Sequence, residues 1–239
     1  MSEPATPGLG DVGTRDRERL EALYVAHHGS RARYGFAYRL EERGPQLAAW
    51  VGRGRRALDL GCRDGSLTAY YAAGNVVTGI DIDRAALAVA RERLGIETVW
   101  LNLNTEPIPF SDGTIDVVIA GEILEHLVAP SDVVGEVYRV LCPTGIFVGS
   151  LPNSFHWRAR LEFLRGKSSE DPTHLHQFSL ERARALFEGF ASVEIVPIGS
   201  IGGRVIPKFP RTVADWVISR WPTLFASDFL FRAAKQPQF

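Results

Sequence analysis

The sequence predicts an α/β fold with a mostly parallel β-sheet covered by helices on both faces. From about residue 57 onward, short β-branched apolar runs alternate with amphipathic stretches of helical period, which is typical of parallel sheets. The chain has 239 residues, enough to bury a substantial core without disulfides or metals. Its content of 45% hydrophobic and 23% charged residues is that of a globular protein.

The β-branched apolar runs predict the strands, and the stretches of helical period predict the helices. The predicted strands are Ala57–Gly61, Val76–Ile82, Thr98–Leu103, Ile115–Gly121, Ile146–Leu151, Val193–Ile198 and Phe229–Ala233. The predicted helices between them include Leu67–Ala73, Arg84–Leu94, Pro130–Leu141 and Leu180–Gly189. Such alternation predicts a layered domain in which each strand leads into a helix and then into a further parallel strand.

Three segments stand outside the alternation. Residues 1–14 are rich in Gly, Pro and small side chains, so we expect a flexible tail. Residues 15–50 show short helical patterns interrupted by glycine and proline. Residues 153–178 are polar and aromatic without strand character, which favours a functional insertion. Residues 15–239 are thus predicted to be one domain with two additions.

Charge and cysteine content exclude several classes of protein. The formal net charge of -1 argues against a general binder of nucleic acids or membrane surfaces. Cys62 and Cys142 lie far apart without a metal-type spacing, which argues against a disulfide framework. The first residues lack an apolar signal core, and no run approaches the ~18 apolar residues of a membrane span. These features predict a cytoplasmic protein.

The strongest local signal is the run Ala57-Leu-Asp-Leu-Gly-Cys-Arg-Asp-Gly-Ser-Leu67. Gly61 allows a sharp turn after the first strand, and Gly65 allows the next element to begin close to a ligand. Asp59 closes this strand and Asp81 closes the next one. Ligands of open α/β sheets bind at such strand ends, where a carboxylate can accept hydrogen bonds from both hydroxyls of a ribose.

A glycine-rich turn alone is also compatible with an NAD(P)-dependent oxidoreductase. A turn that binds pyrophosphate usually leaves amides open and keeps acids away, whereas Asp59 and Asp64 flank this one. Acids suit the cationic amino and sulfonium groups of S-adenosylmethionine (SAM). The residue types therefore favour SAM as the ligand.

These motifs resemble those of the class I, Rossmann-like SAM-dependent methyltransferases. ALDLGCRDG is similar to their first motif, VVTGIDID to their second, and NLNTEPIPFSDGTIDVVIAGEILEHL to their third and fourth. The similarity covers roughly residues 55–150. It implies a seven-stranded sheet in the order 3-2-1-4-5-7-6 with the last strand antiparallel. It also implies a helical lid over SAM at residues 15–50 and an acceptor-side insertion at residues 153–178.

The resemblance further implies the SAM-binding residues. They are Asp59, Gly61, Cys62, Arg63, Gly65, Asp81, Ile82, Asn102, Leu103, Asn104, Gly121 and Glu122. Two positions depart from the family pattern. Arg63 replaces a glycine, so its side chain is expected to point outward. Asn102 or Asn104 replaces an aspartate that faces the adenine amino group, and an amide oxygen can accept the same hydrogen bond.

The fourth strand leads into Glu122-Ile-Leu-Glu125-His126, beside the reacting methyl group in this fold. Glu122 and Glu125 lie three residues apart and share a face on a helical turn. The O-methyltransferases of ubiquinone biosynthesis and the small-RNA 2′-O-methyltransferases similarly carry Glu-x-x-Glu-His and a distant histidine. One hypothesis is a divalent metal site, for Mg²⁺ or Zn²⁺, formed by Glu122, Glu125, His126 and His176. A second gives catalytic roles to His126, Glu125 and His174, with a histidine as general base. In a third, these residues are structural or order SAM.

The insertion carries features suited to an acceptor. Phe155 and Trp157 can stack on a planar or sugar group. Arginine and lysine side chains can receive an anion such as phosphate, or remain solvated: Arg158, Arg160, Arg165 and Lys167. The segment from Pro152 also resembles methyltransferase-like proteins associated with methionine biosynthesis, so a non-catalytic SAM-binding partner protein is an alternative.

The sequence therefore predicts a methyltransferase that moves the methyl group of SAM to a small-molecule acceptor, with oxygen favoured over nitrogen as nucleophile. The constellation of two glutamates and two histidines is the reason for preferring oxygen. An aromatic cluster near the C-terminus is compatible with a homodimer.

Overall fold

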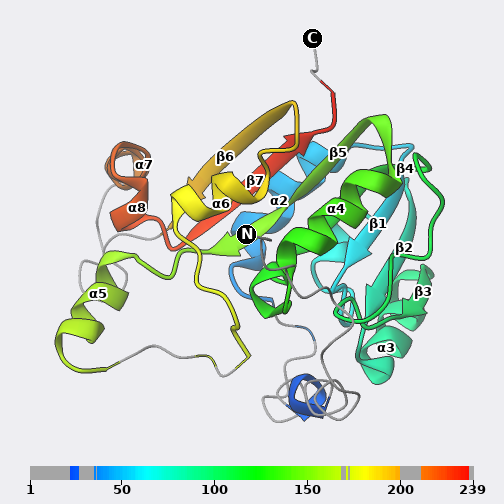
Figure 1. Ribbon diagram of the computed structural model, residues 1–239, viewed down its shortest axis with the longest axis horizontal. Helices are drawn as coiled ribbons and strands as arrows, with labels where there is room; N and C mark the ends of the chain where they lie inside the picture. The colour runs from blue at the N-terminus through cyan, green and yellow to red at the C-terminus, as the bar shows by residue number, and fades with distance from the viewer. Residues whose placement is uncertain are drawn as a thin grey trace, which may run out of the picture.

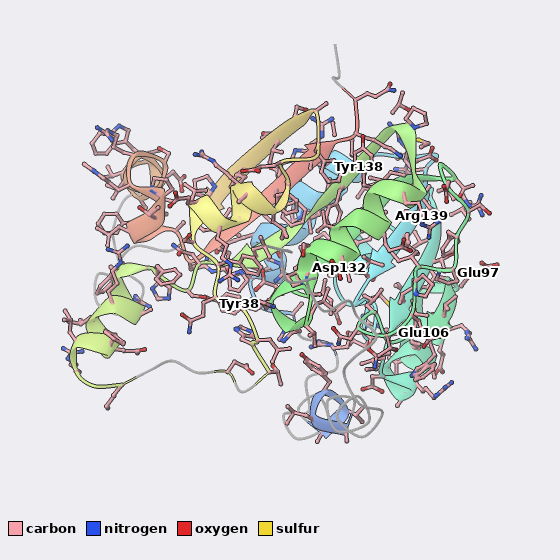
Figure 2. The ribbon with its side chains drawn as sticks, in the orientation of Figure 1. Tyr38, Glu97, Glu106, Asp132, Tyr138 and Arg139 are labelled. Atoms are coloured by element: carbon pink, nitrogen blue, oxygen red, sulfur yellow. The ribbon has the colours of Figure 1, made fainter. Side chains whose placement is uncertain are left out.

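The computed structural model describes residues 22–26, 35, 37–167, 171, 173–199 and 211–236. A seven-stranded sheet in the order β3-β2-β1-β4-β5-β7-β6 runs through the molecule (Figure 1). The strands are β1 Arg56–Leu60, β2 Val76–Asp81, β3 Glu97–Trp100, β4 Ile115–Gly121, β5 Leu141–Pro152, β6 Ser192–Ile198 and β7 Asp228–Ala234. Strand β7 pairs antiparallel with both β5 and β6, whereas the other pairs are parallel. The predicted strand order and the antiparallel last strand are confirmed.

Helices cover the sheet on both faces. The described helices are α2 Leu40–Val51, α3 Arg84–Leu94, α4 Pro130–Val140, α5 Trp157–Leu164, α6 Leu180–Leu186, α7 Arg211–Arg220 and α8 Pro222–Phe225. Two single turns of 3-10 helix follow strands, η2 Thr68–Tyr70 and η3 Leu124–His126. The α4 and α6 helices contribute to one core cluster and α2 and α3 to the other.

The alternation of strand β4 shows why the sheet needs cover on both sides. Ile115, Val118 and Ala120 belong to the core cluster beneath α4, and Val117 and Ile119 belong to the cluster beneath α2. All five are fully buried. A strand that is apolar on both faces is stable only between two layers of helices, which is the layering that the sequence predicts.

Three predicted elements are clearly shorter than expected, and one of them is the helix predicted over Leu180–Gly189, which ends at Leu186. The stretch predicted as a helix over Leu67–Ala73 forms only the turn Thr68–Tyr70. The strand predicted over Thr98–Leu103 ends at Trp100. Its end has a local cause: the side-chain oxygen of Asn102 accepts the Asn104 N–H at 3.0 Å, which turns the chain away from the sheet.

The tail predicted for residues 1–14 lies outside the described residues, as do His27 and His28. Of the segment 15–50, the structure describes a helical turn at residues 22–26, Gly35 and the chain from residue 37 onward. Across the described ranges, no helix has the length and apolar character needed to span a bilayer.

Candidate active site

A cavity of about 1010 Å³ opens at the carboxyl ends of the parallel strands. Its walls come from the turns after β1, β2 and β4, from α2, and from α5 with residues 171–177. Because these strands are parallel and adjacent, the polar residues that end them meet at one edge. The cavity therefore lies where the sequence places the ligand.

The glycine turn after β1 approaches this cavity closely. Gly61 and Gly65 have φ angles of 70° and 75°, which favour glycine. A Cβ atom at Gly65 would lie 2.6 Å from Leu94 Cδ1, and one at Gly61 would lie 3.0 Å from the Ile123 side chain. Cys62, which lines the cavity between them, is buried, and burial raises the pKa of its thiol. The turn thus presents backbone to a ligand, and the cysteine stays a protonated thiol.

Asp59 is buried near the end of β1 and is held by two hydroxyls. Its Oδ2 accepts hydrogen bonds from Thr68 Oγ1 at 2.6 Å and from the Tyr71 hydroxyl at 2.8 Å. Burial raises its pKa to about 6, although the two hydroxyls act in the opposite direction. The short turn η2 is thus explained in part by its contacts with this carboxylate.

Asp81 ends β2 and lines the same cavity as Asp59. Its two carboxylate oxygens accept the backbone N–H groups of Arg63 and Asp83, each at 2.8 Å. Burial raises its pKa to about 6, against the effect of these two amides. The amides fix the orientation of the carboxylate, and each oxygen retains capacity for a further donor.

The structure corrects the expectation that Arg63 points outward. Its side chain is only 17% exposed, and its Nε lies 3.5 Å from Asp64 Oδ1. Asp64 also accepts the N–H of Gly35 at 2.5 Å and the hydroxyl of Ser66 at 2.8 Å. Burial alone would raise the pKa of Asp64, but these donors lower it below the ordinary value. Arg63 adopts a φ of 49°, in the left-handed region that a glycine would occupy more easily.

The other side of the cavity carries two amides and two apolar residues, Asn102, Asn104, Ile82 and Leu103. The Asn102 side-chain oxygen accepts the Asn104 N–H, and the Asn104 side-chain oxygen accepts the Val128 N–H at 2.8 Å. Both amides line the cavity, so both stay candidates for the adenine contact. Gly121 and Glu122 line it from the end of β4.

Glu125, His126 and His174 come together on the rim of this cavity. One ligand atom from each lies within 4.8 Å of the others. The rings of His126 and His174 meet edge to face with centroids 4.8 Å apart. Backbone N–H groups of Leu175 and His176 donate to the Glu125 carbonyl at 2.8 and 3.0 Å, which docks the insertion on η3.

Neighbouring groups determine the tautomer of His126 and the environment of the Glu125 carboxyl group. His126 Nδ1 lies 2.9 Å from the Thr173 carbonyl, which can only accept, so Nδ1 carries the proton and the lone pair of the neutral ring is on Nε2. The Glu125 side chain is fully buried, and neither of its carboxylate oxygens has a hydrogen-bond partner among the described residues. Burial and the nearby Glu122 raise the pKa of Glu125 well above its ordinary value.

The expected metal-binding set is corrected at His176. Its Nε2 lies 3.1 Å from the Val128 carbonyl and its Nδ1 lies 3.3 Å from an Arg182 nitrogen. Both ring nitrogens are thus engaged, and the described cavity lining includes His174 but not His176. Glu122 lies beside the cluster, with Oε1 3.7 Å from Arg43 Nη1.

Two buried charged residues of this site were missed in the sequence. Arg43 of α2 is 2% exposed and lines the cavity, and its Nε has no hydrogen-bond partner within the described ranges. Asp228 of β7 accepts the Ser227 hydroxyl at 2.5 Å and lies 3.3 Å from Arg39 Nε. Burial and the nearby Glu122 raise its pKa to about 7. In the sequence, each of them is only a charged residue next to an apolar stretch, which does not indicate a functional role.

Tyr24 was placed in a helical segment but given no role. It is buried, and its hydroxyl donates toward the backbone carbonyl of His126 and lies 3.3 Å from that of Thr173. A residue near the N-terminus of the chain thus contacts the rim of the cavity.

Comparison with known proteins agrees with this geometry. Residues 58–149 match a family model described as a methyltransferase domain. A probable S-adenosylmethionine-dependent methyltransferase of Mycolicibacterium smegmatis is 32% identical over 138 residues, 56% of this chain and 51% of that protein. A ubiquinone biosynthesis O-methyltransferase of Aromatoleum aromaticum is 33% identical over 127 residues, 48% of this chain and 54% of that protein. The chain spans about half the length of these two relatives.

Solved structures share the fold at lower identity. A SAM-dependent methyltransferase of Thermotoga maritima, described as a possible histamine N-methyltransferase, is 13% identical with a TM-score of 0.65, covering 92% of this chain and 100% of that chain. A Haemonchus contortus phosphoethanolamine N-methyltransferase in complex with SAM is 18% identical with a TM-score of 0.60, covering 96% and 61%. The protein has the class I, Rossmann-like methyltransferase fold. Within that fold, residues 58–149 are similar in sequence to the matching family of methyltransferase domains.

Proposed function

We propose that this protein transfers the methyl group of SAM to a hydroxyl oxygen of a small-molecule acceptor. The observation that carries the proposal is the convergence of Asp59 and Asp81, from adjacent parallel strands, on one cavity whose wall is a glycine turn. Residues 15–239 would form a single domain. Residues 15–50 would be its lid and residues 153–178 its acceptor side.

The residues of the cavity fit SAM. The Asp81 carboxylate is held by two amides and suits the two ribose hydroxyls. The bare backbone of Gly61 lines the cavity and permits close approach of the methionine portion, whereas Gly65 lets the turn pack against Leu94 of α3. Arg43 is a buried cation in the same cavity, and we assign it to the carboxylate of the ligand. Asp59 and Asp64 supply negative charge for the cationic groups.

SAM supplies a methyl group on a sulfonium, which an acceptor oxygen can attack in line while the carbon–sulfur bond breaks and the electron pair stays on sulfur. The protein then has to align the acceptor, exclude water and remove a proton. We assign the role of general base to His126. Its Nδ1–H is held by the Thr173 carbonyl, so Nε2 can accept the proton of the acceptor hydroxyl. Glu125 Oε1 lies 3.9 Å from Nε2, too far for a hydrogen bond, so the Thr173 carbonyl is the group that positions the imidazole.

A divalent metal is a second candidate for the same cluster. Glu125 has two buried carboxylate oxygens without partners in the described part of the chain, and two imidazoles lie within 4.8 Å. Carboxylate and imidazole together suit Zn²⁺ or Mn²⁺, and a bound ion would lower the pKa of a ligated hydroxyl. The ligand set would be Glu125, His126 and His174, and Glu122 is not part of this group.

Metal binding separates the two roles of the cluster. Zn²⁺ and Mn²⁺ are titrated by calorimetry into the wild type and into His174→Ala, with His176→Ala as the matched control. The metal role requires binding that His174→Ala removes and His176→Ala preserves. Full methyl transfer after exhaustive chelation excludes the metal and leaves the general-base role.

The proposed function itself is tested by calorimetry with S-adenosylhomocysteine, the product of methyl transfer, and by a screen of hydroxylated acceptors with labelled SAM. Binding of the nucleoside together with label transfer to an oxygen supports the proposal. Binding without transfer to any acceptor supports the alternative of a non-catalytic partner protein. Binding of NAD(P) in place of S-adenosylhomocysteine supports an oxidoreductase.

A further inference from the structure

Helix α5 lacks the usual reason for carrying large apolar side chains. None of its residues, all of them described, is buried. Phe163 and Leu164 are 76% and 82% exposed. Figure 1 shows α5 set apart from the sheet, at the side where the chain then returns toward α6. Within the described ranges, these apolar groups belong to no core cluster, and on the cavity side they are available to a ligand.

The side chains of α5 that line the cavity occupy one face of the helix. Within α5 and the turn after it, the lining residues are Ala159, Arg160, Phe163, Leu164 and Lys167. Ala159, Arg160, Phe163 and Leu164 have the spacing i, i+1, i+4 and i+5 of a single helical face, and Lys167 lies in the turn after the helix. Arg158, Leu161 and Arg165 belong to the other side and are not among the described lining residues.

This face has a definite order of chemistry. Arg160 lies near the start of α5, the two apolar residues follow, and Lys167 comes last. Lys167 follows the left-handed Gly166, and its N–H donates back to the Glu162 carbonyl at 2.9 Å. An extended ligand can contact a cation and the apolar pair together.

Arg160 is anchored for this role. Its Nε donates to the Phe155 carbonyl at 2.7 Å, so the two terminal nitrogens hold its other donors. On the facing segment, Asp171 accepts the N–H and the hydroxyl of Thr173 at 3.0 and 2.7 Å. The acid across the cavity is thus already engaged with its own turn.

The geometry points to an acceptor that is an anionic amphiphile. Its apolar chain packs on Phe163 and Leu164, its carboxylate or phosphate pairs with Arg160, and Lys167 adds positive charge at the outer end. Its hydroxyl reaches the cluster of Glu125, His126 and His174, which lines the same cavity. This inference rests on the proposed function because it names the class of acceptor for that site.

Direct binding tests the inference without knowledge of the natural acceptor. Decanoate, decyl phosphate, decanol and butyrate are titrated below their micellar concentrations into the full chain saturated with S-adenosylhomocysteine. Decanoate or decyl phosphate should bind at least about tenfold more tightly than decanol, which lacks charge, and than butyrate, which lacks the chain. The stronger of the two anions identifies the headgroup.

Variants on the two faces of α5 provide the controls. Phe163→Ala should weaken decanoate binding about tenfold, and Leu161→Ala on the opposite face should leave it within about twofold. Arg160→Ala should reduce decanoate affinity to that of decanol, and Arg165→Ala should preserve the difference. Because α5 has no buried residue, all four variants should retain the thermal unfolding midpoint of the wild type.

Equal affinity for decanoate, decanol and butyrate overturns the inference, as does equal weakening by Phe163→Ala and Leu161→Ala. If S-adenosylhomocysteine binds and the anions do not, the acceptor class is wrong and the proposed function stands. If S-adenosylhomocysteine itself does not bind, the proposed function fails first.

Discussion

His126 donates its Nδ1–H to the backbone carbonyl of Thr173 at 2.9 Å, across 47 residues of sequence. This contact joins the turn after β4 to the segment that follows α5. It fixes the tautomer of the imidazole and brings His174, the next residue, edge to face with its ring. The segment that follows α5 and the turn that follows β4 therefore form one site.

The first prediction concerns His126 as the base. His126→Ala should lower kcat by ~10²–10⁴-fold, because proton removal from the acceptor loses its partner. Binding of S-adenosylhomocysteine should change by less than about threefold, since the ribose and turn contacts remain. Turnover with an acceptor found in the screen and calorimetry measure the two effects.

His176→Ala is the matched control for that variant. The His176 ring is bonded to Val128 and Arg182, so its loss should change stability and leave kcat near the wild-type value. Equal losses of kcat in the two variants would contradict the assignment of His126.

The second prediction concerns Arg43 and the carboxylate of SAM. Arg43→Gln should weaken S-adenosylhomocysteine binding by at least about tenfold, since a charge-assisted hydrogen bond contributes ~1.5–3 kcal/mol. Methylthioadenosine lacks the amino-acid carboxylate, so its affinity should be nearly equal in wild type and variant. A parallel loss for both nucleosides would show that Arg43 acts through folding, and the carboxylate assignment would fail.

The third prediction is a pH dependence set by Asp81. Burial raises its pKa to about 6, above the ordinary 3.8, so the carboxylate form that accepts ribose hydroxyls is lost as pH falls through 6. Affinity for S-adenosylhomocysteine should be full above about pH 7. It should be up to about tenfold lower at about pH 5, where only about a tenth of the group is ionised.

Asp81→Asn provides the comparison for this profile. The variant should bind S-adenosylhomocysteine more weakly at about pH 8 and lose less affinity at about pH 5 than the wild type, with Asp59, whose pKa is also raised to about 6, causing the remaining change. Calorimetry at both values checks it, and a slope as steep as that of the wild type assigns the dependence to another group.

The fourth prediction separates backbone strain from steric collision at the glycine turn. Gly65→Ala places a Cβ 2.6 Å from Leu94 at a φ of 75°. The variant therefore carries both the conformational cost of the positive φ and the steric cost of the contact. Gly95→Ala has a similar φ of 65° with nothing within 4 Å, so it carries the conformational cost alone.

In urea unfolding, Gly65→Ala should therefore be destabilised more than Gly95→Ala, by roughly 1–3 kcal/mol. It should also lose affinity for S-adenosylhomocysteine, whereas Gly95→Ala should bind normally. Equal destabilisation of the two variants would mean that the turn relaxes around the added methyl group.

The sequence alone was sufficient for the sheet and for bringing Asp59 and Asp81 to one edge of it. The β-branched runs are buried on both faces, so periodicity and burial agree along β1, β2 and β4. Asp59 and Asp81 sit at the ends of adjacent strands, and parallel pairing by itself brings such ends to one edge. The glycine turn between β1 and η2 is local and depends on residues close in the chain.

The tertiary structure decided what distant segments contribute. Arg43 comes from α2 and Asp228 from β7, and no sequence period links either of them to β4. The choice of His174 over His176 depends on how the insertion docks on the Glu125 carbonyl, a long-range backbone contact. Arg63 turned inward because Asp64, fixed by Gly35 and Ser66, offers it a buried partner. Local chemistry thus specified the sheet and its turn, whereas packing between remote elements specified the reacting end of the cavity.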